Sequence, residues 1–414
     1  MPTNSNRISL QAWLLIAAAV ALLAVAMGSR SVFGLFISPL NSATGLGIAT
    51  ISFAVAMSQL AWGAAQPLTG MLADRYGAAR VIAAGSLLSA ACGALLPFAG
   101  SAALLVAVLA ASGIAATVGS PSLLVGTVSQ RVPAERRGLI AGIIGAGGPL
   151  GQLVLAPATQ GLITVAGWVS AALGLAALSL VALPLAFAFR RRPGAPAQAP
   201  GRAGATVREA LASRGFWLIN ATFFVCGLHV FFLVTHLPGV IEACGLPPAV
   251  SGIALAVLGL FNIAGSIGAG FVIQRYSMKA TLAALFAARA LGIAAFLAAP
   301  KTEFTVLAFS VWMGLTYMAV LPPTAGLVGK LYGAERLATL LGLVFLLHQV
   351  GAFLGSWLGG VVFEATGGYD AMWLLDLTLA AIAAGIALTI PERGAKPAPV
   401  VSLPRAAQTA GTPA

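Results

Sequence analysis

Three basic or titratable side chains interrupt long apolar runs of this sequence, and they are its clearest candidates for chemistry. Arg30 lies towards the end of the first run, and His229 and His348 lie inside two later runs. Inside a membrane an ionisable side chain is costly, so it is a functional candidate by default. A guanidinium can bind a carboxylate through two parallel hydrogen bonds, and a histidine can carry a proton or, when charged, help to hold an anion. These residue types favour an anionic ligand.

Other polar side chains in the same runs could line a cavity or simply join helices through hydrogen bonds. From these we select Gln349, Asn262 and Tyr317 as further candidate substrate-binding residues. The basic residues also have structural alternatives. Arg30 could extend to the outer headgroups, and each histidine could make a neutral interhelical hydrogen bond. For Arg289, packing or an interhelical pair is favoured over a substrate role.

The elements that must position these residues are membrane helices. Apolar residues make up 59% of the 414 residues and charged residues only 8%, against roughly 25% charged in soluble proteins. Runs of about 20 apolar residues or more are too long for barrel strands. We therefore predict an all-α membrane protein whose first helix is retained rather than cleaved, with twelve transmembrane helices in two pseudo-symmetric bundles of six, at 10–38, 48–70, 80–98, 102–128, 138–163, 167–189, 214–240, 248–274, 280–298, 302–328, 337–363 and 369–390.

The distribution of basic residues predicts the domains and the orientation. We expect an N-terminal bundle at 1–190, a flexible basic linker at 191–213, a C-terminal bundle at 214–391 and a disordered tail at 392–414. With the N-terminus inside, nearly all loop arginines and lysines fall on one side, and Lys301 alone lies in an opposite loop. The positive-inside rule then places both termini in the cytoplasm and the protein in the inner or plasma membrane. The net charge of +12 therefore indicates orientation and no nucleic-acid partner.

The sequence of a polar turn between the second and third apolar runs is partly repeated in the second half of the chain. The sequence Gly-Met-Leu-Ala-Asp-Arg-Tyr-Gly-Ala-Ala-Arg spans residues 70–80, and Gly270 and Arg275-Tyr276 repeat part of it about 200 residues later. A repeat of this length in a chain of this size indicates two similar halves, as in many transporters.

This arrangement resembles the major facilitator superfamily. The resemblance implies two bundles that rock against each other, with helices one, four, seven and ten lining the cavity. It also implies that the turn gates the cytoplasmic side, through Asp74 pairing with the other half. The alternative is a polar turn that only fixes topology. The predicted gate residues are Gly70, Asp74, Arg75, Gly77, Arg80 and Arg275.

Two further segments resemble the oxalate/formate antiporter and monocarboxylate transporter branch of that superfamily. They are the stretch from Gly28 to Pro39, which contains Arg30, and the stretch from Phe345 to Gly359, which contains His348 and Gln349. The chain departs from the branch at Ser266 and His348, where the oxalate antiporter holds its dicarboxylate with arginine and lysine. The acid–arginine pair that animal monocarboxylate carriers keep in the eighth span is also absent.

Carboxylates are scarce in the apolar runs. Of ten acidic residues only Asp376 lies well inside a run, and the resemblance places that run at the periphery. We therefore expect no acid to face the basic residues, which disfavours an exporter of cationic drugs. The chain also has no nucleotide-binding, nucleophile or metal-ligand motif, so we expect neither an enzyme nor a cofactor or metal.

These observations predict a secondary transporter of a small organic anion, monocarboxylate-like, that works by alternating access with proton coupling or anion exchange. We expect it to act in the lipid bilayer as a monomer, without a nucleic-acid partner. One alternative is efflux of hydrophobic or neutral compounds, with Arg30 structural. Another is a sensor or scaffold that keeps the fold without transporting.

Overall fold

A computed structural model describes residues 9–133, 136–190, 203–333 and 336–392. Within these ranges the regular elements are all helices, and no strand is present. The predicted all-α fold is therefore confirmed. Each helix closes its own backbone hydrogen bonds, which is what a chain of this apolar composition needs inside a bilayer.

The first half of the chain contains several broken helices. The first run ends as an α-helix at Ser31 and continues through a short 3₁₀ turn, and the fourth breaks just before Pro121, where proline favours a new helix start. The elements are α1 (Leu10–Ser31), η1 (Phe33–Phe36), α2 (Ile37–Thr44), α3 (Ile48–Tyr76), α4 (Ala78–Leu95), η2 (Leu96–Phe98), α5 (Ala102–Ala116), η3 (Thr117–Gly119), α6 (Pro121–Ser129), α7 (Arg137–Gly145), α8 (Gly147–Leu180), α9 (Ala182–Ala186) and η5 (Phe187–Phe189).

The second half is more regular, with one break in its tenth run. That break separates Thr316 from Leu321 and precedes Pro322-Pro323, which cannot continue a helix from the preceding turn. The elements are α10 (Ala203–Leu211), α11 (Arg214–Ala243), α12 (Ala249–Val272), α13 (Met278–Ala298), α14 (Glu303–Thr316), α15 (Leu321–Tyr332), α16 (Leu337–Thr366) and α17 (Asp370–Thr389).

The number of membrane crossings depends on Gly167. Eleven helical stretches of the described residues are long and apolar enough to span a membrane, and one of them covers the 53 residues from Arg137 to Phe189. At 1.5 Å per residue that stretch is about 80 Å long, far more than the roughly 30 Å of a bilayer core. Gly167 interrupts it with φ 81° and ψ 163°, a conformation that favours glycine. The stretch therefore makes two crossings, giving the twelve expected.

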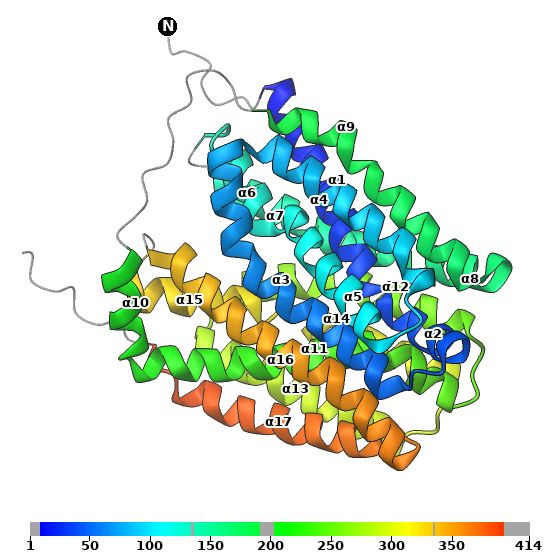
Figure 1. Ribbon diagram of the computed structural model, residues 1–414. Coiled ribbons are helices and arrows are strands. Elements are labelled where there is room, and N and C mark those ends of the chain that lie inside the picture. Colours follow the sequence, from blue (N-terminus) through cyan, green and yellow to red (C-terminus); the bar gives the residue numbers. More distant parts are fainter. Residues whose placement is uncertain (1–8, 134–135, 191–202, 334–335, 393–414) are drawn as a thin grey trace, which may run out of the picture.

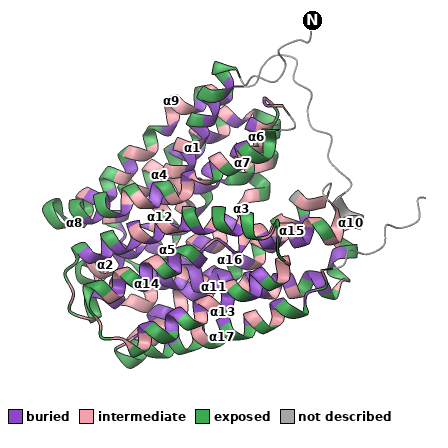
Figure 2. Ribbon diagram, turned by 180° about the vertical axis from the view of Figure 1, so that it is seen from behind, coloured by how far each residue is buried: buried purple, intermediate pink, exposed green. Residues whose placement is uncertain are grey.

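The helices form two groups, one from each half of the chain (Figure 1). We call 9–190 the N-terminal group and 203–392 the C-terminal group. Across the boundary α3 packs on α16, α8 on α12, and η1 on α11. Figure 2 shows α11 near the middle of the molecule with mostly buried residues. The packing around it explains why its histidines, His229 and His236, are almost completely buried.

The two groups are in contact from one end of the molecule to its middle, and they separate towards the other end. We call the end where α3 begins and α11 and α16 finish the opposite face, and the end where α3 finishes and α11 and α16 begin the terminal face. Near the opposite face, the ring of Phe53 lies 5.9 Å from that of Phe353 and 5.6 Å from that of Trp357. At the terminal face, a Cβ added at Gly70 or Gly268 would meet no atom within 4 Å. The groups are therefore closed at the opposite face and apart at the terminal face.

The predicted linker contains more structure than expected. Helix α10 occupies residues 203–211, inside the stretch predicted to be flexible, and Trp217 donates a hydrogen bond of 2.8 Å from Nε1 to the carbonyl of Leu211. This part of the stretch expected to be a flexible linker is therefore helical, because its alanines and the Val-Arg-Glu-Ala-Leu sequence favour a helix. Residues 191–202 of the linker, and all of the predicted tail except Glu392, lie outside the described residues.

Candidate functional site

Six side chains meet where α1 and α3 of the N-terminal group face α11 and α16 of the C-terminal group. We call them the central cluster: Arg30, Gln59, Trp62, Phe231, His348 and Gln349. Arg30 donates from Nη2 to Oε1 of Gln59. Its guanidinium carbon lies 4.2 Å from the centroid of the Trp62 ring, a position that favours a cation–π interaction. Two residues of α3, one turn apart, therefore hold the guanidinium.

The remaining hydrogen-bond donors of Arg30 are poorly used. Its Nε has no hydrogen-bond partner, and its Nη1 reaches only the sulfur of Met27, at 3.9 Å. No carboxylate of a described residue forms an ion pair with Arg30. A guanidinium without a counter-charge in a low-dielectric region is available to bind an anion.

His348 shares a neighbour, Phe231, with this guanidinium. The Phe231 ring centroid is 5.8 Å from the guanidinium carbon of Arg30 and 6.2 Å from the ring of His348. His348 is 3% exposed, both its ring nitrogens lack hydrogen-bond partners, and Phe223 packs against it at 4.7 Å. A neutral imidazole with two unused polar atoms can accept or donate to a ligand that reaches it.

Gln349 completes the cluster from the next position of α16. Its side chain lies so close to α3 that a Cβ on Gly63 would meet its Cγ at 2.7 Å. Its Oε1 and the indole Nε1 of Trp62 are buried without partners. Because buried polar atoms are nearly always paired in native proteins, several unpaired ones in a single cluster indicate a site for a ligand or water.

A cavity opens from Arg30 into the N-terminal group. Hydroxyl groups are a large share of its lining, from Ser29, Ser58, Ser86, Ser89, Ser112 and Ser179. The hydroxyl of Ser29 has no hydrogen-bond partner. The hydroxyls of Ser58, Ser86 and Ser179 already donate to carbonyls of their own helices. The hydroxyl of Ser29 is free to donate to an anion beside the guanidinium.

Asn262 and Tyr317 lie at the break between α14 and α15 rather than in the central cluster. The Oδ1 of Asn262 accepts hydrogen bonds from the backbone N–H of Met318, at 3.2 Å, and from the hydroxyl of Ser266, at 3.3 Å. The hydroxyl of Tyr317 donates to the carbonyl of Val230 at 3.4 Å. Asn262 is therefore satisfied within the protein, and Tyr317 connects the break to α11.

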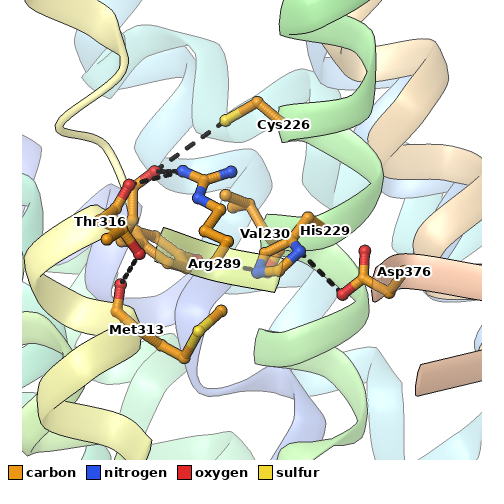
Figure 3. Close-up of polar contacts among 8 residues, drawn as sticks. Cys226, His229, Val230, Arg289, Met313, Thr316 and Asp376 are labelled. Carbon is orange, nitrogen blue, oxygen red and sulfur yellow. Dashed lines mark hydrogen bonds and ion pairs between the residues drawn. The ribbon is translucent and has the colours of Figure 1, made fainter. Parts of the chain in front are cut away.

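His229 is paired with an acid, contrary to expectation. Its Nδ1 lies 2.8 Å from Oδ2 of Asp376 on α17, and both side chains are almost completely buried (Figure 3). We predicted that no acid would face the basic residues, and this prediction is wrong for His229. A helix at the periphery still turns one face towards its bundle, and α17 packs that face on α11 and α13. The repeat counterpart of Arg30 is thus directed into the C-terminal group.

The predicted gate residues lie apart from the other half. Asp74, Arg75 and Arg80 are exposed, and Asp74 forms no ion pair with any described residue. Arg75 instead lies over the ring of its neighbour Tyr76, at 5.2 Å. Gly77, with φ 88°, makes the turn between α3 and α4, and the pairing of Asp74 across the boundary remains a prediction for another state.

Sequence reasoning missed Trp62 and Phe231 as members of the central cluster. For Trp62 a signal existed, because Gln59, Trp62 and Gly63 share one face of a helix at spacings of three and four. For Phe231 there was none, since phenylalanine is common on every face of a membrane helix. Aromatic residues therefore enter the site only once the packing is known.

Comparisons with known proteins agree with this fold. Residues 18–303 and 241–410 match the family model of the Major Facilitator Superfamily, and the chain belongs to this family. It is similar to Monocarboxylate transporter 13 of Rattus norvegicus, at 24% identity over 391 residues that cover 92% of this chain and 89% of that protein. It is also similar to the Oxalate:formate antiporter of Oxalobacter formigenes, at 25% identity with 93% of each chain covered.

Among solved structures, a D-xylose-proton symporter superposes with a TM-score of 0.72, at 16% identity, over 92% of this chain and 98% of that one. This likeness concerns the fold alone. Taken together, the family and the fold identify the chain as a multi-pass membrane transporter of a small molecule, and not an enzyme.

Proposed function

We propose that this protein is a secondary active transporter of a small organic anion, monocarboxylate-like in size and charge. The observation that carries the proposal is the guanidinium of Arg30, held between the two helix groups with an unpartnered Nε and no counter-charge. Its position fits the family's general design, in which substrate sites lie near the bilayer midplane between the two halves. The named relatives, which are carriers of monocarboxylates and of oxalate and formate, support the same class of substrate.

In the proposed mechanism Arg30 binds the carboxylate, and His348 and Gln349 bind from the other group. An anion that bridges α1 and α16 lies between the two groups. The groups can then rotate about the bound anion so that either face opens in turn, as alternating access requires. The closed opposite face and the separated terminal face then represent one of the two states. With both termini in the cytoplasm of a plasma or inner membrane, this state faces inward.

A flux assay tests the proposal. The protein is reconstituted in proteoliposomes, and uptake of radiolabelled formate, oxalate and lactate is compared for the wild type and Arg30→Gln. A charge-assisted hydrogen bond contributes about 1.5–3 kcal/mol, so we expect at least a tenfold loss. The matched control is Arg208→Gln, which removes an exposed basic residue of α10. Equal uptake by wild type and Arg30→Gln for every transported anion would overturn the assignment.

A second candidate function is efflux of hydrophobic or neutral compounds. The aromatic surroundings of His348, with rings from Phe223, Phe231 and Phe345, favour it because they offer an apolar surface beside the cluster. In this case Arg30→Gln leaves transport intact, and a strain lacking the protein becomes more sensitive to hydrophobic compounds. The two candidates therefore predict opposite results for the same variant.

A further inference from the structure

The most deeply buried carboxylate of the described chain lies outside the central cluster. Asp376 is 0% exposed, whereas every other described acidic residue is exposed or half-buried. Its Oδ2 lies 2.8 Å from Nδ1 of His229, although the two atoms are not aligned for a hydrogen bond. The Nε2 of His229 has no partner either. The carboxylate and the imidazole are in contact and have polar atoms without hydrogen-bond partners. The pair can therefore bind one more proton.

Arg289 provides the balancing charge from α13. Its side chain is completely buried, and Nη2 donates to the carbonyls of Thr316 and Tyr317, while Nε and Nη1 have no partner (Figure 3). With Arg289 positive, Asp376 negative and His229 neutral, the three side chains have no net charge. One added proton gives them a charge of +1. Such a charge is expensive in a low-dielectric interior unless an anion is close by.

We infer that His229 and Asp376, balanced by Arg289, form a proton-binding site that couples proton movement to transport of the anion. The inference rests on the proposed function and assigns its coupling ion. One proton binds to the carboxylate–imidazole pair as one anion binds at Arg30, and both leave on the other side of the membrane. Only an O–H or N–H bond forms and breaks.

The groups facing the pair come from every helix packed against it. Cys226 of α11 lies within electrostatic range of Arg289 and Asp376, and its thiol donates to the carbonyl of Tyr317 at 4.0 Å. His348 of α16 lies near Arg289. His236, further along α11, is held by the carbonyl of Ser356 at 2.7 Å. Among these groups Asp376 is the only carboxylate.

Tyr317 provides the physical connection between the pair and the anion. Its carbonyl accepts from Arg289, and its hydroxyl donates to the carbonyl of Val230, the residue after His229. Tyr317 also lies within electrostatic range of Arg30, at the break between α14 and α15. When the pair takes up a proton, it attracts the guanidinium of Arg289 less strongly. This guanidinium donates to the carbonyls of Thr316 and Tyr317, so protonation changes the contacts that hold the break. The anion in turn stabilises the added positive charge, and this coupling is reciprocal.

A transport experiment separates coupling from binding. Wild type, Asp376→Asn and His229→Gln are reconstituted, with the panel carboxylate that gives the highest uptake as probe. An inward proton gradient drives accumulation in the wild type. In both variants the accumulation falls at least about tenfold, but exchange of internal for external labelled anion is retained. The double variant Asp376→Asn with Arg289→Gln removes both charges and leaves the site neutral, so it is measured in case Asp376→Asn alone does not fold. Gradient-driven accumulation that persists in Asp376→Asn would overturn the inference.

An infrared titration tests the site without any substrate. Difference spectra between about pH 5 and about pH 8 are recorded in water and in heavy water for wild type, Asp376→Asn and Asp370→Asn. We expect a buried carboxyl band that titrates in the wild type, is missing in Asp376→Asn and is unchanged in Asp370→Asn, because Asp370 is exposed on the same helix. A spectrum that Asp376→Asn leaves unchanged would contradict the inference.

The two failures can be told apart. If Asp376 titrates while no carboxylate uptake depends on Arg30, the proposed anion function fails and the proton site stands. If uptake depends on Arg30 but neither accumulation nor the infrared band depends on Asp376, the proton site fails and the anion function stands. In that second case the pair serves only to fix α17 to α11.

Discussion

The opposite face and the terminal face hold the same two helix groups in different ways. At the opposite face the groups are closely packed: the Phe53 ring lies against Phe353 and Trp357, and a Cβ on Gly34 would lie 2.5 Å from the carbonyl oxygen of Val234. At the terminal face, charged turns such as that of Asp74 stand exposed, and a Cβ on Gly70 would meet nothing within 4 Å. This difference indicates that close packing holds the opposite face shut. The terminal face could close only through its exposed polar turns.

The largest effect is expected from Gly34→Ala. Its added methyl group would overlap the backbone of α11, and overpacking of this kind costs about 1–3 kcal/mol. Opening the opposite face relieves the overlap, so the variant should favour the state that is open there by about tenfold or more. A cysteine at Ser52, which is buried against Gly360, measures this through its labelling rate with a membrane-impermeant maleimide.

The control for Gly34→Ala is Gly385→Ala on α17, an exposed glycine with no atom within 4 Å of an added Cβ. Both variants are measured in a background without native cysteines. Equal labelling of Ser52→Cys in the two variants would show that steric fit does not close the opposite face.

A smaller effect is expected from Glu364→Gln. This carboxylate at the end of α16 accepts from the backbone N–H of Ala49, at 2.9 Å, and so caps the first turn of α3 in the other group. An exposed carboxylate at a helix N-terminus contributes about 0.3–1 kcal/mol. Labelling of Ser52→Cys should therefore rise by up to about fivefold. Glu303→Gln, at the exposed first turn of α14 on the same face, should leave it unchanged.

A third, smaller effect is expected for the polar turns at the terminal face. Asp74→Asn should slow the conformational cycle more than Gln274→Ala, because only the first removes a charge available to pair with the other group. Exposed pairs contribute about 0.2–1 kcal/mol, so transport rates should fall two- to threefold for Asp74→Asn. Transport rates that fall equally in the two variants would mean that the turn of the N-terminal half has no special part in closing this face.

The sequence predicted the helices and the basic end of the site well for physical reasons. Long apolar runs and the break near Gly167 are local signals. Arg30, His348 and Gln349 lie near one another because their helices line the boundary between the groups, and their role in binding a substrate stays a prediction. Asp376 was misjudged, because the lipid-facing and protein-facing sides of α17 are both apolar. In a membrane helix hydrophobicity alone does not say which side turns inward. The partner of His229 therefore appeared only in the structure.

The last predicted effect is local and concerns Glu392 at the terminal face. Burial raises the pKa of this carboxyl, but hydrogen bonds from the Ser277 hydroxyl and the Met278 N–H, together with Lys330 and Lys279, outweigh burial and hold the pKa below its ordinary value. A lowered pKa means that the contribution to stability is complete above the ordinary value of about 4.3. It is lost as the pH falls through the folded-state pKa. Because the group is partly exposed, the contribution stays below about 1 kcal/mol.

Hydrogen exchange measures this contact locally. In Glu392→Gln the amides in the first turn of α13 should exchange up to about fivefold faster than in the wild type near neutral pH, and the difference should shrink as the pH falls below about 4. Amides at the other end of α13, near Ala298, are the internal control and should not respond. A difference that is the same at all pH values would mean that the side chain acts through packing. The charge of the terminal face would then have no part in holding α13, and the contrast with the sterically closed opposite face would weaken.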